Sequence, residues 1–180
     1  MTPQELFELA LTYYNGTEDI PQNYLKAYDL FLKAAEAGCV QAQSYLCKML
    51  SLGEGIDVNM AESVKWGLLA AEGGDADAQN RLGVRYYNGE GVEQDYTLAA
   101  KWFLRSANAG FPKAIGNIAY LYGVGKGVTQ SDEEALKWAK KAAANGIDNT
   151  ELLIGYDYVE EEARDYEAAV KWFTLAAEKG

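Results

Sequence analysis

The sequence contains no histidine, and this absence removes the commonest general base and the commonest metal ligand of proteins. Catalytic triads that need histidine and zinc sites that contain it are therefore excluded, and two cysteines cannot form a four-cysteine site. No run of about 18 apolar residues is present, so we expect no transmembrane helix. The first residues carry no basic side chain and Glu8 interrupts the apolar stretch, so we expect no export signal and a cytoplasmic location.

Basic residues are also scarce. The chain has 16 lysine and arginine residues against 27 aspartate and glutamate residues, a formal net charge of -11. Such a surface repels nucleic acids and anionic membranes, so we expect neither as a partner. With 180 residues, 49% of them hydrophobic, the chain has the composition of one ordinary folded domain.

What the sequence does contain is an internal repeat with a period of 36 residues and a last step of 34. Three series of residues keep this period: tryptophans, glycines and residues of types that cap helices. They are Trp66, Trp102, Trp138 and Trp172; Gly38, Gly74, Gly110, Gly146 and Gly180; and Asn23, Asn59, Asp95, Ser131 and Asp165. A pair of small residues precedes each glycine, as Ala34 and Ala35 do before Gly38.

The order of these residues predicts a pair of helices in every repeat. The cap residue opens the second helix, small and large residues follow on one face, and the glycine ends the helix by adopting positive φ. Ahead of it, spacings of four and eight, as in Ala78, Leu82 and Tyr86, predict a first helix. The expected ranges are 3–15, 24–37, 40–52, 60–73, 76–88, 96–109, 112–124, 132–145, 148–160 and 166–179. The fold class is therefore all-α, with ten helices and no strand.

The third repeat carries a more specific pattern. From Ala78 through Leu82-Gly83 and Gly89-Glu90-Gly91-Val92 to Trp102 and Gly110, it resembles a Sel1-like repeat, a relative of the tetratricopeptide repeat. The resemblance covers the chain as one domain of five repeats, at 1–38, 39–74, 75–110, 111–146 and 147–180. It implies a right-handed α/α solenoid with no enzymatic activity. The first repeat departs from the pattern with Leu30 in place of tryptophan, and the fifth lacks the glycine loop.

The Gly-x-Gly loops and the tryptophans each allow two interpretations. Glycine loops at helix starts can hold phosphate, but those at 53–55, 89–91 and 125–127 follow no strand and lack the Lys-Ser/Thr pair. We therefore favour tight turns that need positive φ. The tryptophans could stack on single-stranded nucleic acid, but the negative charge favours core packing, so Trp102→Ala should be among the most destabilising substitutions.

Cys39 and Cys47 are expected on one helix, eight residues apart. Their Cα atoms would then lie about 12 Å apart, beyond the roughly 7 Å that a disulfide allows. We expect two buried free thiols, which favours a reducing compartment. Successive carboxylates in the acidic run at 160–167 diverge, so we interpret the run as a solvated loop, with a weak divalent-cation site as the alternative. We expect no catalytic residues, no metal and no cofactor.

By the resemblance, the first helices of the repeats line a concave groove. The groove candidates are Phe7, Leu11, Tyr14, Gln41, Ser44, Lys48, Asp77, Asn80, Val84, Tyr87, Lys113, Tyr120, Leu152 and Tyr156. This mixture of amide, aromatic and charged side chains suits peptide binding. The alternative is that these residues form only a solvated surface.

The sequence therefore predicts a non-catalytic scaffold or adaptor that binds a protein or peptide in the groove, with a basic segment favoured by the negative charge. The alternative is a regulatory or immunity-type inhibitor that caps one basic toxin or enzyme. Solenoids need covered ends, and the chain stops at Gly180 on a repeat boundary. We expect the last repeat to be covered by another copy of the chain, by a partner or by residues that follow this sequence.

Overall fold

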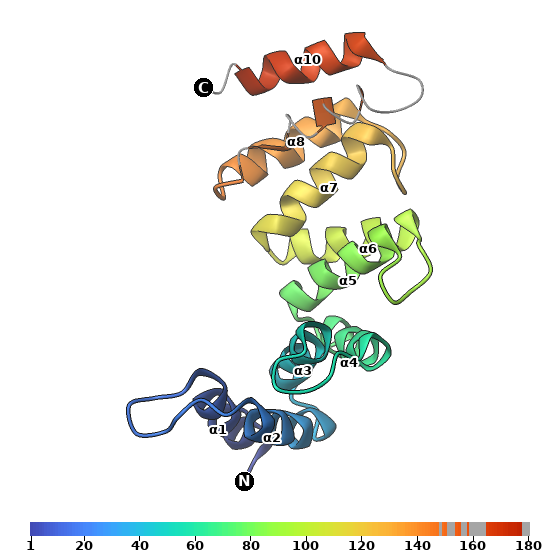
Figure 1. Cartoon of the computed structure of the whole chain (residues 1–180). Coiled ribbons are helices and arrows are strands. Elements are labelled where there is room, and N and C mark those ends of the chain that lie inside the picture. Colours follow the sequence, from blue (N-terminus) through green and yellow to red (C-terminus); the bar gives the residue numbers. More distant parts are fainter. Residues whose placement is uncertain (148, 151–153, 156–157, 159–164, 178–180) are drawn as a thin grey trace. The chain divides into compact units, whose positions relative to one another are not determined.

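The computed structural model describes residues 1–147, 149–150, 154–155, 158 and 165–177 (Figure 1). Every regular element in this part of the chain is an α-helix, which confirms the all-α prediction for it. The helices are α1 (Pro3–Asn15), α2 (Tyr24–Glu36), α3 (Val40–Leu52), α4 (Met60–Glu72), α5 (Ala76–Asn88), α6 (Tyr96–Asn108), α7 (Pro112–Val124), α8 (Asp132–Ala143) and α10 (Tyr166–Ala177). The helix expected at 148–160 lies largely outside the described residues.

The second helix of each repeat begins at the predicted cap residue. The side chains of Asn23, Asn59, Asp95 and Ser131 each accept a hydrogen bond from the backbone N–H three residues further on. Asp165 does the same for the N–H of Ala168, at 3.0 Å. These contacts satisfy donors that the first turn of a helix leaves free, which is why the helix starts lie where the sequence predicts them.

The predicted glycine ends are Schellman motifs, which close a helix with two backbone hydrogen bonds. The N–H of Gly38 donates to the carbonyl of Ala35, and the N–H of Cys39 donates to the carbonyl of Ala34, both at 3.0 Å. The same pair of bonds recurs at Gly74, Gly110 and Gly146, and all four glycines have φ between 78° and 95°. The small residue pair before each glycine therefore supplies the accepting carbonyls.

The Gly-x-Gly loops are turns, as the sequence predicts. The six glycines at 53, 55, 89, 91, 125 and 127 have φ between 71° and 75°. A Cβ on Gly55 would lie 2.3 Å from the Cβ of Tyr24, and one on Gly127 would lie 2.0 Å from the carbonyl oxygen of Tyr96. In these two loops the second glycine is required both for its conformation and for the close approach of the loop to a preceding helix.

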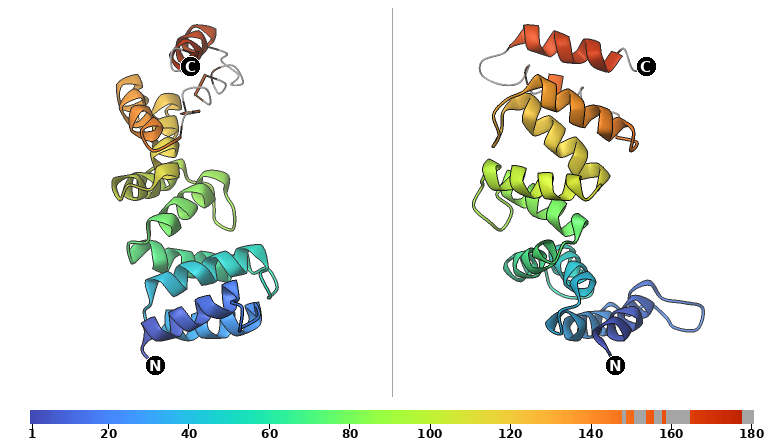
Figure 2. Two further views of the ribbon diagram at one scale, coloured as in Figure 1. Left: turned by 90° about the vertical axis from the view of Figure 1, so that its left-hand side faces the viewer. Right: turned by 180° about the vertical axis from the view of Figure 1, so that it is seen from behind.

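The chain divides into two compact units, Met1–Gln94 and Asp95–Gly180. The boundary falls inside the third repeat, between α5 and α6, and the expectation of a single domain stays a prediction. In the first unit, α2 packs against α1 and α3, and α4 packs against α3 and α5 (Figure 2). In the second, α7 packs against α6 and α8.

The core of the first unit contains an aromatic cluster. The rings of Phe7, Tyr14, Phe31 and Tyr45 contact one another with centroids 4.9–6.0 Å apart. The core of the second unit is mainly aliphatic. Its fully buried side chains include Ile115, Ile118, Leu121, Ile154 and Trp172.

A buried polar chain links three helices of the first unit. Arg85 of α5 is only 7% exposed, and its Nη2 donates to the hydroxyl of Ser63 on α4 at 2.6 Å. That hydroxyl donates in turn to the carbonyl of Cys47 on α3, also at 2.6 Å. A serine at a position where other repeats have alanine thus provides a partner for a buried guanidinium.

The core prediction for the tryptophans holds for three of the four. Trp66, Trp138 and Trp172 are 7%, 9% and 0% exposed. Trp102 is only half-buried, because the following residue, Phe103, is 3% exposed and occupies the core position. In the other repeats, where the tryptophan itself is buried, the next side chain does not fill the core. Gly67 and Ala139, which follow Trp66 and Trp138, are small, and Phe173, which follows Trp172, is half-buried. Each second helix therefore buries one large ring at this point.

Both cysteines are buried free thiols, as predicted. Cys39 is the N-cap residue of α3 and Cys47 lies within the helix, so their placement on one helix is confirmed. No helix of the described part is long and apolar enough to span a membrane.

Candidate functional site

The predicted groove residues of the first unit come from α1, α3 and α5. Six of them are half-buried and one is exposed, so their side chains lie at the surface of these helices: Leu11, Ser44, Lys48, Asp77, Val84, Tyr87 and Gln41. The other three, Phe7, Tyr14 and Asn80, are buried, with exposures of 8%, 8% and 6%. Phe7 belongs to the aromatic core, so it packs beneath this face and is not exposed on it.

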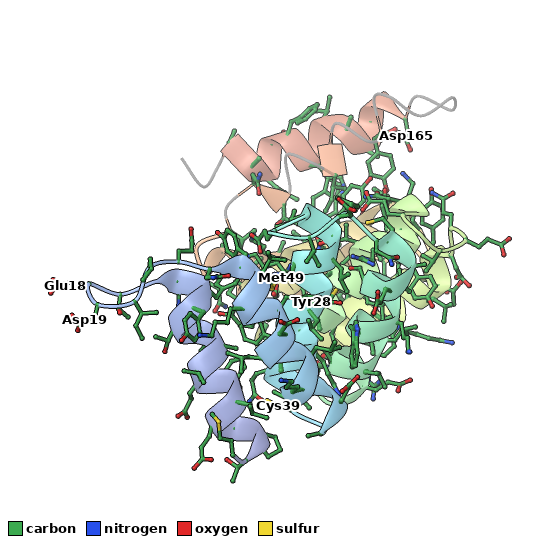
Figure 3. All side chains as sticks on the ribbon, turned by 60° about the horizontal axis from the view of Figure 1, so that its bottom comes forward. Glu18, Asp19, Tyr28, Cys39, Met49 and Asp165 are labelled. Carbon is green, nitrogen blue, oxygen red and sulfur yellow. The ribbon has the colours of Figure 1, made fainter. Side chains whose placement is uncertain are left out.

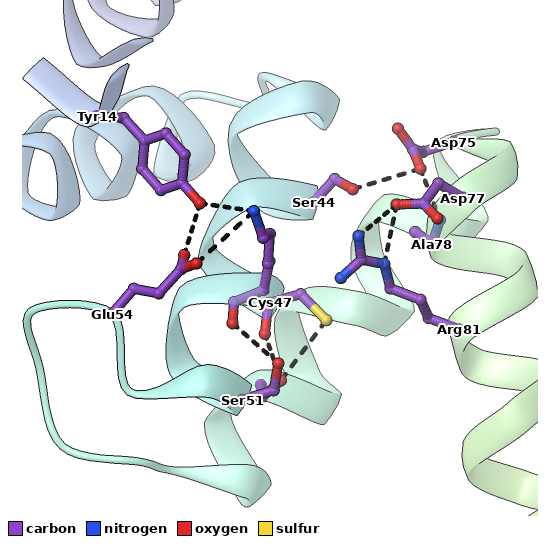
Figure 4. A network of polar contacts seen from close by, with 11 residues as sticks. Tyr14, Ser44, Cys47, Ser51, Glu54, Asp75, Asp77, Ala78 and Arg81 are labelled. Atoms are coloured by element: carbon purple, nitrogen blue, oxygen red, sulfur yellow. Dashed lines mark hydrogen bonds and ion pairs between the residues drawn. The ribbon is translucent and has the colours of Figure 1, made fainter. Parts of the chain in front are cut away.

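Tyr14, Lys48 and Glu54 form the most connected polar cluster of this face (Figure 4). The Lys48 ammonium donates to the Tyr14 hydroxyl at 2.6 Å, and that hydroxyl donates to Oε2 of Glu54, also at 2.6 Å. An ion pair of 3.7 Å between Lys48 and Glu54 closes the triangle. Side chains from α1, α3 and the following Gly-x-Gly loop are thereby fixed relative to one another.

The surroundings of Tyr14 keep its hydroxyl protonated. Burial of the ring and the hydrogen bond to Glu54 raise the pKa of the Tyr14 phenol well above its ordinary value. The ring itself packs against Tyr24 and Tyr45, with centroids 5.2 and 5.3 Å away. Lys48 and Glu54 keep 33% and 21% of their side-chain surface exposed, so both charges remain accessible to a ligand.

A second polar cluster lies at the start of α5 (Figure 4). The Ser44 hydroxyl donates to Oδ1 of Asp75 at 3.3 Å, and the same oxygen caps α5 by accepting from the N–H of Ala78 at 2.7 Å. One turn further, Arg81 donates to Oδ2 of Asp77 through Nε at 2.8 Å and Nη2 at 2.6 Å. Side chains of Asp77 and Arg81 are 39% and 36% exposed.

The second unit repeats one of these contacts. The Lys126 ammonium lies 3.4 Å from the Tyr120 hydroxyl and 5.8 Å from the centre of its ring. Tyr120 and Lys126 stand two repeats after Lys48 and Glu54. The middle residue of a Gly-x-Gly loop thus contacts the same helix position in both units. Of the other candidates, Lys113 is exposed, and Leu152 and Tyr156 lie outside the described residues.

Sequence reasoning missed Glu54, Arg81 and Lys126 as members of this face. The spacing of Asp77 and Arg81, four residues apart on one helix, is a signal that could have identified the arginine. The charged middle residues of the loops, Glu54 and Lys126, are a second signal. It was not used because the loops were interpreted only as turns. No cluster of three or more metal-ligating side chains occurs among the residues that the structure describes. Of the acidic run at 160–167, residues 160–164 lie outside the described part.

Comparison with known families agrees with this architecture. A profile of the Sel1 repeat matches residues 6–39, 40–75, 76–111, 112–147 and 155–180. The chain belongs to the Sel1 repeat family. Sel1 repeat proteins form α/α solenoids, generally lack catalytic activity and typically mediate protein–protein interactions.

Solved structures resemble this Sel1 repeat chain over almost its whole length. One is c5321, a protective antigen of uropathogenic Escherichia coli strains, at 35% identity and a TM-score of 0.79. Another is a Sel1 repeat protein from Oxalobacter formigenes, at 29% identity and a TM-score of 0.80. Both align with 99% of this chain, which spans 38% of the first protein and 72% of the second.

A more distant likeness concerns the fold alone. The immunity protein Pa5087 from Pseudomonas aeruginosa aligns with 97% of this chain and over 64% of its own length, at 16% identity and a TM-score of 0.56. Among curated proteins, no match was found.

Proposed function

We propose that this Sel1 repeat protein is a non-catalytic scaffold that binds a partner protein or peptide on the face formed by α1, α3 and α5. The observation that carries the proposal is the preorganised polar face: Tyr14, Lys48 and Glu54 form one fixed cluster, and Asp77 with Arg81 forms another. Preorganised groups bind a ligand without a large cost of ordering side chains. The protein-binding role typical of the family supports the same conclusion.

The groups on this face suit a peptide backbone and a basic side chain. Both hydrogen bonds from Arg81 go to Oδ2 of Asp77, which leaves Oδ1 for a donor on the partner. The exposed amide of Gln41 can donate and accept, as a peptide backbone requires. Residues 1–38 hold six acidic and two basic residues, and Glu18 and Asp19 are exposed on the loop after α1 (Figure 3). A basic segment of the partner is therefore attracted to this unit.

The test is capture from cell lysate followed by mass spectrometry, with matched variants. Lys48→Met and Asp77→Asn change the proposed face, whereas Glu133→Gln changes an exposed charge on α8. We expect partners that wild type and the Glu133 variant retain to be lost by both variants of the face. The proposal fails if all four proteins, each with the circular dichroism spectrum of wild type, retain the same set.

A second candidate function is inhibition of one basic toxin or enzyme, which the net charge of -11 favours. Affinity separates the two roles. An inhibitor forms a tight one-to-one complex, whereas an adaptor binds its partners reversibly with micromolar dissociation constants. Isothermal titration calorimetry with the captured protein decides between them.

Two further expectations accompany the proposal. The buried free thiols support a reducing compartment such as the cytoplasm. Self-association through the last repeat is supported by Val170 of α10, an apolar side chain that is 63% exposed. Light scattering at high concentration should show an oligomer for wild type and a monomer for Val170→Lys. The matched control is Leu25→Lys on α2, at an equally exposed position, which should leave the oligomer unchanged.

A further inference from the structure

A second surface of the molecule, on α6, is basic and partly apolar, unlike the polar face of α1, α3 and α5. A hollow of about 420 Å³ on α6 is lined by Leu98, Lys101, Trp102, Leu104 and Arg105. Trp102 is half-buried, whereas Trp66, Trp138 and Trp172 are buried in their cores. Part of a large aromatic ring is therefore accessible at this hollow, beside two leucines.

The surroundings of the hollow are basic. Between Tyr96 and Asn108, α6 contains no acidic residue, and both Lys101 and Arg105 are exposed. The Arg105 guanidinium lies 5.0 Å from the centre of the Trp102 ring, a cation–π contact.

Positive charge is also present on the neighbouring helix, around Trp138. Lys140 and Lys141 are exposed on α8, where the Lys141 ammonium lies 4.8 Å from the centre of the Trp138 ring and 3.5 Å from the carbonyl oxygen of the buried Ala107. The basic side chains that line the hollow itself are Lys101 and Arg105, in a chain whose net charge is -11.

The repeat itself shows what the fold requires here and what it does not. Lysine precedes tryptophan in four repeats, so Lys101 alone is a feature of the repeat. Basic residues in the last turn favour any helix through its dipole, which accounts for Lys140 and Lys141. In α4, however, the counterpart of Arg105 is Leu69 and the counterpart of Trp102 is the buried Trp66. The fold therefore does not require a half-buried tryptophan with a guanidinium in contact with its ring.

We propose that this basic surface, made of the five residues of the hollow, binds an acidic segment of a partner protein that places one apolar side chain against Trp102. Tryptophan and arginine are the residues most enriched at the energetic centres of protein interfaces. Acidic partners are repelled by most of this chain, so complementary charge directs them to this surface. The basic surface lies on α6, the second helix of its repeat, and the polar face on first helices, so the inference does not rest on the proposed groove.

Fluorescence anisotropy with synthetic peptides tests the proposal. The probe is a short fluorescein-labelled peptide of glutamates around a single leucine. We expect it to bind the full-length protein, more weakly as salt is added, and to change the fluorescence of Trp102. Trp102→Ala and Arg105→Glu should each weaken binding at least about 10-fold. Lys65→Glu on α4, at the position that matches Lys101, should leave binding unchanged.

Further controls make each outcome decisive. A peptide with serine in place of the leucine should bind more weakly, and Lys48→Met on the polar face should bind the acidic probe as wild type does. Because Arg105 is exposed, Arg105→Glu should keep the wild-type melting temperature even if Trp102→Ala does not. The proposal is overturned if folded Arg105→Glu binds the probe as tightly as wild type, or if the serine peptide binds equally well. Tighter binding of a single-stranded DNA oligonucleotide would also overturn it, because the surface would then recognise nucleic acid.

Discussion

Tyr14 connects the aromatic core of the first unit to its polar face, and its protonation should therefore be visible in the stability of the protein. Its pKa is raised above 10, first by burial and then by Glu54, whereas in the unfolded chain it is near 10. Below pH 10 the phenol is protonated in both states and its contacts contribute fully. Above pH 10 the unfolded chain loses this proton first, so the free energy of unfolding falls.

Tyr14→Phe tests this linkage. At neutral pH the variant should lose about 1–2 kcal/mol, because Lys48 and Glu54 each lose a hydrogen-bond partner. Above pH 10 the gap to wild type should narrow, since phenylalanine has no proton to release. Urea unfolding on both sides of pH 10 measures the difference. A gap that stays constant would show that Tyr14 ionises as easily in the folded protein as in the unfolded one.

The glycine at the end of a second helix can be tested separately from its surroundings. Gly110 has φ 85°, and no atom lies within 4 Å of the place where a Cβ would stand. Gly110→Ala should therefore cost only the backbone term, about 1–2 kcal/mol, and Gly110→Asn less. Gly127→Ala should cost more than Gly110→Ala, because its Cβ would lie 2.0 Å from a carbonyl oxygen. Equal melting temperatures for the two alanine variants would contradict this difference.

At the scale of the helix, one buried ring per second helix decides which aromatic substitutions are severe. Trp138→Ala removes a ring that is 9% exposed and should cost about 3–5 kcal/mol. Trp102→Ala removes a half-buried ring and should cost about 1–2 kcal/mol. Phe103→Ala should resemble Trp138→Ala. Thermal melts that rank Trp102→Ala as the most harmful of the three would restore the expectation drawn from the repeat alone.

The same helices show how much of the fold could be predicted from the sequence. The starts of α2, α4, α6 and α8 follow from capping side chains and their ends from glycine, both of which act within a few residues. Trp102 escaped prediction because its burial depends on competition with Phe103 for one space. The cluster of Tyr14, Lys48 and Glu54 escaped prediction because Tyr14 belongs to the first repeat and the other two to the second, and the period does not specify side-chain contacts between repeats.

At the scale of the whole chain, the two compact units do not coincide with the sequence repeats. The boundary after Gln94 separates α5 from α6 inside the third repeat, so α5 belongs with the first two repeats. Its Arg85 supplies the buried bond to Ser63 that these repeats need.

A fragment of residues 1–94 should therefore fold by itself, with a helical spectrum and a cooperative melt. A fragment that stops at Gly74 loses α5 and should melt at a lower temperature, although it ends on a repeat boundary. Circular dichroism of both fragments measures the comparison. If the shorter fragment proved the more stable, the repeat rather than the compact unit would be the smallest folding unit.

The Schellman ends also bear on how such a chain can grow. Each turn is closed by backbone atoms, so nothing in it depends on which side chains the next repeat carries. A duplication that inserts another copy of residues 75–110 after Gly110 would join the chain through the same pair of carbonyls and the same glycine. Gene length can then change in whole repeats while the outward-facing residues diverge. The molecule would acquire new binding surfaces by duplication of a repeat and substitution of its surface residues, with the core residues unchanged.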